Sequence, residues 1–476
     1  MYLKHFFREK NIIVLLLLAT IMLSLPYLIR ASENNDNLIR GEPYYHARMS
    51  QAMTDQGMQS SDALSFGGRD YLFNPFHYIM GLLISFLGLM LAAKLLPLIL
   101  GLASLLVFYL ILKKLRLESK KIFLICAILI FTPIFIYTFT VLNSHALVIL
   151  LVLLGFYFFM HKSKTIRLIS LLVLMTLPLF SLFSALIALL ALLVYSLHKK
   201  NIKNFYPVLF FLLAISAIYY VPEFIRQGIP SYIVQNIRVD NFISDIGGIM
   251  GFSVFSIILA CVGLFFVNKK KSFIFLIAAL FALSFYFGSQ INLYLNFIVV
   301  VLAGEGFFRL IQREWESKIL RNFSIIVLVC GIMFSPISYT KELSSSLPDQ
   351  AVVDSLIWLK ENSDKDDVVF SAHEKGFWIE YFAQRPAVMD NLFEFAPQLK
   401  QRAEDSSTIF KSNNLDITRV LLDKYDIRYI WIDPAMKKQL WNNKRTALLF
   451  LLSNSETFKN VYEQDNIEVW EYLKKE

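Results

Sequence analysis

The stretch IFLICAILIFTPIFIYTFTVLNSHALVILLVLLGFYFFM, residues 122–160, contains no Asp, Glu, Lys or Arg. It is long enough for two membrane-spanning helices joined by a very short turn, because about 20 apolar residues cross a bilayer. The basic residues on its two sides are Lys120, Lys121, Lys162, Lys164 and Arg167. Basic residues gather on the cytoplasmic side of membrane proteins. We therefore predict an outward crossing at Ile122–Thr140, a turn at Val141–Ser144 and a return crossing at Ala146–Met160.

The composition of the whole chain agrees with this stretch. Apolar types make up 56% of the 476 residues and charged types only 17%, whereas soluble domains carry about a quarter of charged residues. This excludes an ordinary soluble enzyme, a disordered chain and a disulfide scaffold. The net charge of +9 comes from short clusters between apolar runs rather than from one basic face. Such clusters indicate membrane topology, so we expect the bilayer and no nucleic acid as a partner.

We predict a polytopic α-helical membrane protein with about eleven spans. One apolar run, Phe76–Leu112, allows either two spans turning near Lys94 or one span preceded by a surface segment. The five basic residues between 113 and 121 lie in the cytoplasm only in the second case. Phe76–Ala92 is therefore expected to pack at the outer surface. The expected spans are Asn11–Ile29, Lys94–Leu112, Ile122–Thr140, Ala146–Met160, Leu168–Leu197 (a hairpin broken near Pro178), Tyr206–Val221, Met250–Val267, Phe273–Phe287, Leu293–Leu310 and Phe323–Ile337.

The alternation of spans sets the expected orientation. The first apolar run follows basic residues and reads as an uncleaved anchor, which places the N-terminus in the cytoplasm. Residues 30–75 and 223–248 then form external loops, and everything after Ser338 is external. We expect a membrane domain at 1–338 and an external soluble domain at 339–476.

The last segment changes in character, because helical and strand patterns alternate there. This alternation predicts a small α/β domain. The expected helices are Val352–Glu361 and Ile417–Tyr425, and the expected strands are Asp367–Ser371 and Ile427–Asp433, with a terminal hairpin at Val461–Tyr462 and Ile467–Tyr472.

The first external loop holds the pair Glu42 and His46, four residues apart. A helix that begins at Pro43 would place both near its first turn. A carboxylate there can accept a proton or hold a metal, with His46 assisting either role. The alternative is an acidic helix start that complements the helix dipole, with a solvated histidine.

Two further places on the expected outer side carry polar side chains. Asn143 and His145 occupy the shortest external turn, where they could bind a metal or a phosphate, or simply cap a helix. Asp245 lies in the second external loop, where it could offer a carboxylate beside loop arginines or be a solvated side chain.

Taken together, these positions resemble the catalytic subunit of oligosaccharyltransferases. The resemblance identifies the chain as a GT-C fold glycosyltransferase related to that family. The segments that carry it, in order, are Glu42–Arg48 (EPYYHAR), Gly68–Pro75 (GRDYLFNP), Asn143–Ile149 (NSHALVI) with Pro133 before it, Ile243–Asp245 (ISD), and Gly376–Pro386 (GFWIEYFAQRP) with Asp390 and Asn391.

The chain departs from the family at two of its motifs, and the arginine that the family has near its later spans has no match around Gln290–Asn292. The acceptor motif WWDYG is replaced by Ala372–Gly376 (AHEKG), so recognition of an Asn-x-Ser/Thr sequon is not expected. Asn143 and His145 stand where the family has two carboxylates, which removes two anionic ligands for a divalent cation.

The resemblance implies a polyprenyl-phosphate or polyprenyl-diphosphate sugar as donor and a site at the outer face of the membrane. It implies Glu42 as the catalytic carboxylate, Asp245 as a second one, and Arg48, Arg69 and His46 as substrate contacts. A divalent cation, Mg²⁺ or Mn²⁺, would be held by Glu42, Asn143, His145 and Asp245.

The acceptor stays open and could be a protein, a lipid or a glycan. Two other classes also stay open. One is a non-catalytic GT-C-like membrane protein that binds or scaffolds, and the other is a transporter of lipid-linked sugar.

Overall fold

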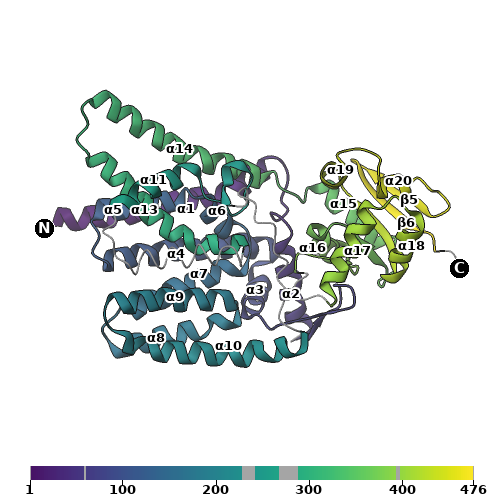
Figure 1. Cartoon of the computed structure of the whole chain (residues 1–476), viewed down its shortest axis with the longest axis horizontal. Coiled ribbons are helices and arrows are strands. Elements are labelled where there is room, and N and C mark those ends of the chain that lie inside the picture. Colours follow the sequence, from purple (N-terminus) through teal and green to yellow (C-terminus); the bar gives the residue numbers. More distant parts are fainter. Residues whose placement is uncertain (1, 58–59, 228–241, 267–287, 393–396, 475–476) are drawn as a thin grey trace. The chain divides into compact units, whose positions relative to one another are not determined.

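The computed structural model describes residues 2–57, 60–227, 242–266, 288–392 and 397–474. These residues form two compact units (Figure 1). The first unit contains residues 2–34, 91–227, 242–266 and 288–345, and the second contains 35–57, 60–90, 346–392 and 397–474. Residues 35–57 and 60–90 thus group with the C-terminal part of the chain. The domains expected from the sequence instead placed them in the membrane domain at 1–338.

The first unit is built from helices, most of them strongly apolar. Their bounds are α1 Tyr2–Ser32, α4 Leu89–Lys114, α5 Ser119–Ile130, α6 Pro133–Thr140, α7 Ser144–Phe159, α8 Lys164–Met175, η1 Leu177–Leu179, α9 Leu182–His198, η2 Ile202–Asn204, α10 Phe205–Gln227, η4 Ser244–Ile246, α11 Val254–Phe266, η5 Gly288–Ile291, α13 Asn292–Gln312 and α14 Lys318–Ser344.

Among the described residues, five helical segments are long and apolar enough to cross a bilayer, and six if the bent pair α5–α6 counts as one span. The chain is therefore a multi-pass membrane protein, while the expected count of eleven stays a prediction. Helices α7, α9 and α11 are apolar but shorter than a full crossing. The expected span Phe273–Phe287 lies outside the described residues.

Prolines divide two of the expected spans. The helix expected at Ile122–Thr140 is two helices, α5 and α6, bent by 64° at a break just before Pro133. Proline cannot donate the backbone hydrogen bond that would continue α5, and the Thr132 side chain caps α6 by accepting from the Phe135 amide. The predicted break near Pro178 is confirmed, because η1 separates α8 from α9 there.

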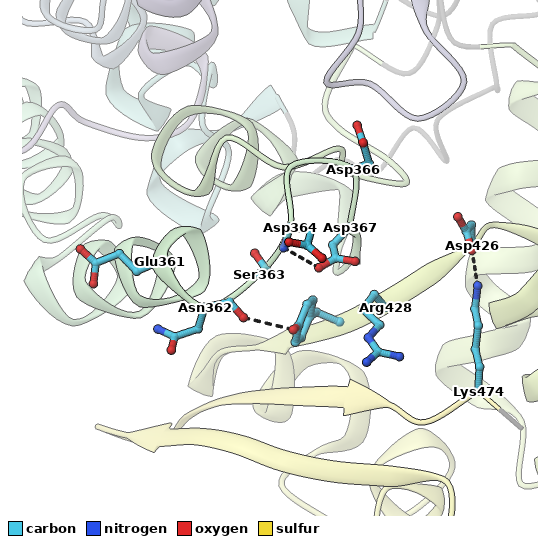
Figure 2. A pocket seen from close by; sticks show the side chains of 10 residues that line it. Glu361, Asn362, Ser363, Asp364, Asp366, Asp367, Asp426, Arg428 and Lys474 are labelled. Carbon is cyan, nitrogen blue, oxygen red and sulfur yellow. Dashed lines mark hydrogen bonds and ion pairs between the residues drawn. The ribbon is translucent and has the colours of Figure 1, made fainter.

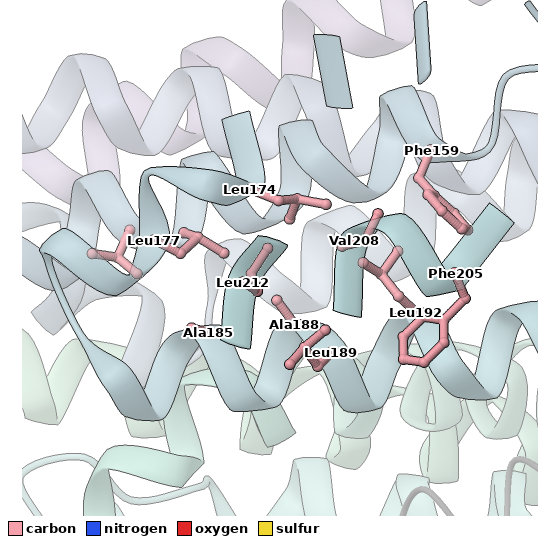
Figure 3. Packing of buried hydrophobic residues seen from close by; sticks show 11 residues of the cluster. Phe159, Leu174, Leu177, Ala185, Ala188, Leu189, Leu192, Phe205, Val208 and Leu212 are labelled. Carbon is pink, nitrogen blue, oxygen red and sulfur yellow. The ribbon is translucent and has the colours of Figure 1, made fainter. Parts of the chain in front are cut away.

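The helices on both sides of the Pro178 break pack around one apolar cluster. Figure 3 shows side chains of α7, α8, α9 and α10 meeting there, among them Phe159, Leu174, Leu192, Val208 and Leu212. All five are less than a tenth exposed. Removal of this surface from water and lipid fixes the helices relative to one another within the unit.

The second unit contains a four-stranded sheet in the order β3-β4-β6-β5, in which only β3 and β4 are parallel. Its strands and helices confirm the predicted α/β character and the terminal hairpin. Their bounds are α15 Gln350–Glu361, β3 Val368–Phe370, η6 His373–Lys375, α16 Gly376–Trp378, η7 Ile379–Ala383, α17 Leu399–Lys411, α18 Leu415–Lys424, β4 Ile427–Ile432, α19 Pro434–Trp441, α20 Leu448–Leu451, β5 Phe458–Gln464 and β6 Ile467–Tyr472.

The N-terminal part of the second unit is small and combines polar and apolar elements. It consists of α2 Glu42–Gln56, the antiparallel pair β1 Ser61–Asp62 and β2 Arg69–Asp70, and the short apolar helix α3 Pro75–Leu87. The turn before β2 has Gly67 and Gly68 at φ of 72° and 75°, a left-handed backbone that glycine adopts without steric cost. Helix α3 is shorter than a span and α4 already begins at Leu89, and the surface position expected for Phe76–Ala92 stays a prediction.

Candidate functional site

Helix α2 places the first predicted pair as the sequence indicated. The helix begins at Glu42, with Pro43 in its first turn. The carboxylate of Glu42 is 30% exposed, while the His46 side chain one turn later is only 6% exposed. The Nε2 of His46 lies 3.5 Å from Oε1 of Glu42. Glu42 therefore stands at the boundary between solvent and a buried interior, at the helix end whose dipole favours a negative charge.

Behind His46 the hydrogen bonds continue into the interior. His46 Nδ1 lies 2.8 Å from Nε2 of His77, on α3. The other nitrogen of His77, Nδ1, lies 2.5 Å from the hydroxyl oxygen of Tyr71. Both imidazoles are buried. The four side chains thus form one row from the partly exposed carboxylate of Glu42 to the partly buried phenol of Tyr71, and we call it the Glu42–Tyr71 row.

Beside this row lies a buried ionic cluster of two guanidiniums and three carboxylates. Arg48 donates to both oxygens of Asp62 at 2.6 and 2.7 Å, and to Glu380 at 2.6 Å. Arg69 donates to Asp62 at 2.6 Å and to both oxygens of Asp390 at 2.7 and 2.8 Å. The cluster ties α2 and β2 to residues more than 300 positions later in the sequence.

Three carboxylates face two cations in this cluster, so one carboxylate lacks a positive partner of its own. Burial alone would raise the pKa of Asp62, but its hydrogen bonds and ion pairs with Arg48 and Arg69 lower it to about 2. Burial and the neighbouring Asp390 raise the pKa of Glu380 well above its usual value. Of the three carboxylates, Glu380 is therefore the one that binds a proton most readily.

The substrate contacts expected in this region are placed as follows. Arg69 is only 3% exposed and is saturated by carboxylates, while Arg48 keeps 15% exposure. His46 hydrogen-bonds inward to His77. The phosphate-contact role of the two arginines stays a prediction, and the structure adds a second role for both, which is to hold the loop together.

The predicted residues of the first unit lie at helix starts. Asn143 caps α7: its Oδ1 accepts from the Ala146 amide at 3.0 Å, and its Nδ2 donates to the carbonyls of Thr138 and Val141. His145 follows in the first turn of the same helix. Asp245, exposed on η4, accepts from the amide of Val254 at 2.7 Å, where α11 begins. The cap interpretation of Asn143 is thus the one that its hydrogen bonds support.

The divalent cation implied by the resemblance would draw its ligands from both units, Glu42 from the second and Asn143, His145 and Asp245 from the first. Within the described residues, no group of three or more His, Cys, Asp or Glu side chains is arranged to hold a metal. The Asn143 amide oxygen is already engaged in the cap. The dependence of the chain on a divalent cation therefore stays a prediction.

A separate hollow of about 510 Å³ lies at one end of the sheet of the second unit (Figure 2). Its cations are Arg428 and Lys474, and Lys474 is paired with Asp426. Since acidic residues outnumber the cations, this hollow would repel a phosphate. Its acidic residues are Glu361, Asp364, Asp366, Asp367 and Asp426.

Sequence reasoning missed His77, Tyr71, Asp62 and the roles of Glu380 and Asp390. Tyr71 and Glu380 each lie within a segment that resembles the family, but no residue pattern in these segments indicates their hydrogen-bond partners. A histidine at the start of an otherwise apolar helix, as His77 is, was the one available signal.

Comparisons with known proteins establish the fold. No family model matches the sequence, and no curated protein matches it. The archaeal oligosaccharyltransferase AglB from Archaeoglobus fulgidus, solved with an inhibitory peptide and a dolichol-phosphate, is similar over 92% of this chain and 70% of AglB, with a TM-score of 0.69 and 12% identity. ArnT from Cupriavidus metallidurans, bound to undecaprenyl phosphate, is similar over 97% of both chains, with a TM-score of 0.52 and 12% identity.

The arabinofuranosyltransferase AftD from Mycobacteria is also similar, over 96% of this chain and 41% of AftD, with a TM-score of 0.58 and 13% identity. All three proteins are GT-C glycosyltransferases. The predicted GT-C fold is therefore confirmed.

Proposed function

We propose that this chain is a membrane glycosyltransferase that moves a sugar or oligosaccharide from a polyprenyl-phosphate or -diphosphate donor to an acceptor at the outer face. The observation that carries the proposal is Glu42, a partly exposed carboxylate at a helix N-terminus that is backed by buried histidines, in a chain with the GT-C fold. The polyprenyl phosphates present in the AglB and ArnT structures support the donor class.

In this proposal Glu42 is the base. Its carboxylate takes the proton of the acceptor hydroxyl or amide while the acceptor atom bonds to the anomeric carbon. The bond from that carbon to the phosphate oxygen breaks, and the lipid phosphate leaves with the electron pair. Because phosphate is already a good leaving group, the chain needs to position the acceptor and balance charge rather than protonate the leaving oxygen. Asp245 is the proposed second carboxylate.

The test is sugar transfer by the full chain in liposomes that contain radiolabelled polyprenyl-phosphate sugars. Glu42→Gln should lower transfer by about 10²–10⁴-fold, the usual contribution of a general base. Asp55→Asn is the matched control, because Asp55 is an exposed carboxylate near the other end of α2. Unchanged transfer in Glu42→Gln at normal expression removes Glu42 from this role. A chelator arm decides whether Mg²⁺ or Mn²⁺ is needed.

A second candidate is a non-catalytic protein that binds lipid-linked sugar. The observation in its favour is Asn143, which replaces a carboxylate of the family motif and uses its amide to cap α7. Donor binding without turnover in the same liposomes would support this candidate. Movement of labelled lipid between leaflets without a new glycosidic bond would instead indicate a transporter.

A further inference from the structure

The Glu42–Tyr71 row has one internally consistent direction for its hydrogen bonds. The Tyr71 oxygen receives the Asn74 backbone N–H at 3.4 Å, and its own proton can go to His77 at 2.5 Å or to the Met53 sulfur at 3.5 Å. Sulfur is a weak acceptor and lies farther away. Tyr71 therefore donates to Nδ1 of His77.

The same direction of hydrogen-bond donation continues from His77 to His46. Burial and the adjacent His46 lower the pKa of His77 well below its usual value, with Arg48 adding to this shift and Asp62 opposing it. His77 is thus neutral and carries a single N–H. With Nδ1 accepting, that proton sits on Nε2 and is donated to Nδ1 of His46. Because Nδ1 of His46 accepts this bond, the ring proton of His46 lies on Nε2, the nitrogen that faces Glu42.

We infer that His77 and Tyr71 are positioning residues, which hold His46 as its Nε2–H tautomer so that it presents an N–H to the carboxylate of Glu42. This inference rests on the proposed role of Glu42 as the base. The row fixes the orientation of the His46 side chain and places its N–H at the carboxylate of Glu42. In other enzymes a carboxylate or a backbone carbonyl orients a catalytic histidine in a similar way. A base held ionised and oriented is ready to take the acceptor proton.

The structure offers variants that separate this role from simple packing. Tyr71→Phe keeps the ring and removes only the donor to His77. His77→Leu removes the donor to His46, while His77→Gln returns an amide N–H close to the position of Nε2. Tyr78→Phe is the matched control, because Tyr78 is an exposed tyrosine next to His77 on α3.

The first readout is ¹⁵N NMR of the histidine-labelled full chain in lipid nanodiscs, with His46 and His77 assigned by substitution. Wild type and Tyr78→Phe should show both side chains as Nε2–H tautomers. Tyr71→Phe should add the Nδ1–H form of His77, and His77→Leu should add the Nδ1–H form of His46. An Nδ1–H tautomer of His46 in wild type, or tautomers that do not respond to either variant, overturns the inference.

The second readout is the separation of kcat from KM in the transfer assay. His77→Leu should lower kcat by roughly 10–100-fold with little change in KM, as loss of an outer partner does elsewhere, and His77→Gln should recover most of the loss. Methionine at this position cannot donate a hydrogen bond. If His77→Met recovered kcat as fully as His77→Gln, the positioning role would be contradicted. The two proposals can fail separately. If the predicted tautomers of His46 and His77 are found in a chain that transfers no sugar, the proposed function is refuted while the inferred hydrogen-bond direction of the Glu42–Tyr71 row stands.

Discussion

Arg48 and Asp62 form a two-point ion pair in which each Nη of the arginine lies 2.6–2.7 Å from a different carboxylate oxygen. The pair joins α2 to β1, and Asp62 at the same time accepts from Arg69. Because the Asp62 side chain is only 2% exposed, water cannot take the place of a partner that this carboxylate loses. Loss of one member therefore leaves the charge of the other buried, which costs far more than an exposed ion pair contributes.

Asp62→Asn should lower the free energy of unfolding of the second unit by about 3–5 kcal/mol. The control is Asp426→Asn, which breaks the exposed pair with Lys474 and should cost at most about 1 kcal/mol. Tryptophan fluorescence during denaturant unfolding of the full chain reports mainly on this unit. Five of the chain's six tryptophans lie in it, namely Trp358, Trp378, Trp431, Trp441 and Trp470. Equal effects of the two variants would show that the buried cluster does not stabilise the unit.

Glu380 should make the stability of the second unit depend on pH in the direction opposite to a normal salt-bridged acid. Its pKa is raised well above the usual 4.5, first by burial and then by Asp390, so the folded state binds this proton more tightly than the unfolded state. Its contribution is present below pH 4.5 and is lost as pH rises through the folded pKa. Asp62, with its pKa lowered to about 2, acts in the other sense and loses its contribution only in strong acid.

Glu380→Gln keeps the shape and an oxygen for Arg48 but cannot ionise. Unfolding curves measured from about pH 5 to pH 8 should therefore fall less steeply for Glu380→Gln than for wild type, with the difference growing as pH rises. Parallel curves would mean that Glu380 is ionised throughout this range, and the proton would have to be assigned elsewhere in the cluster.

The residues that sequence reasoning placed correctly are those whose signal is local. The start of α2 at Glu42 follows from Pro43, and the strand β4 follows from its run of apolar residues. Pro133 was also a signal for a helix break. The continuous apolar run around it nevertheless favoured a single span, so the bend between α5 and α6 was not predicted. By contrast, the partners of Arg48 and Arg69 could not be predicted, because Glu380 and Asp390 reach them through the tertiary fold and no spacing encodes the contact.

Asn143→Ala should destabilise the chain, because α7 loses its N-terminal cap and two buried carbonyls lose the Nδ2 donor. We expect a loss of about 1–2 kcal/mol, the range for N-caps. Ser163→Ala is the matched control, since Ser163 precedes α8 without a side-chain cap hydrogen bond. Thermal unfolding of both variants in the same lipid checks the difference. If Asn143→Ala instead lost transfer activity and kept its stability, the result would favour the metal or phosphate role that the position of Asn143 in the family motif suggests.

The orientation predicted from charge places the second unit outside the cell and the segment between α7 and α8 in the cytoplasm. In the opposite orientation, Lys162, Lys164 and Arg167 would have to cross the membrane during insertion. The second unit contains no short loop with a similar cluster of basic residues that would hold it in the cytoplasm. In a background with the native cysteines replaced by alanine, Ser455→Cys and Lys164→Cys introduce one exposed thiol in each region. An impermeant maleimide should label Ser455→Cys in intact cells, and Lys164→Cys only after the membrane is opened. The reverse pattern would place Glu42, which belongs to the same unit as Ser455, on the cytoplasmic side, and the proposed transfer at the outer face would then be wrong.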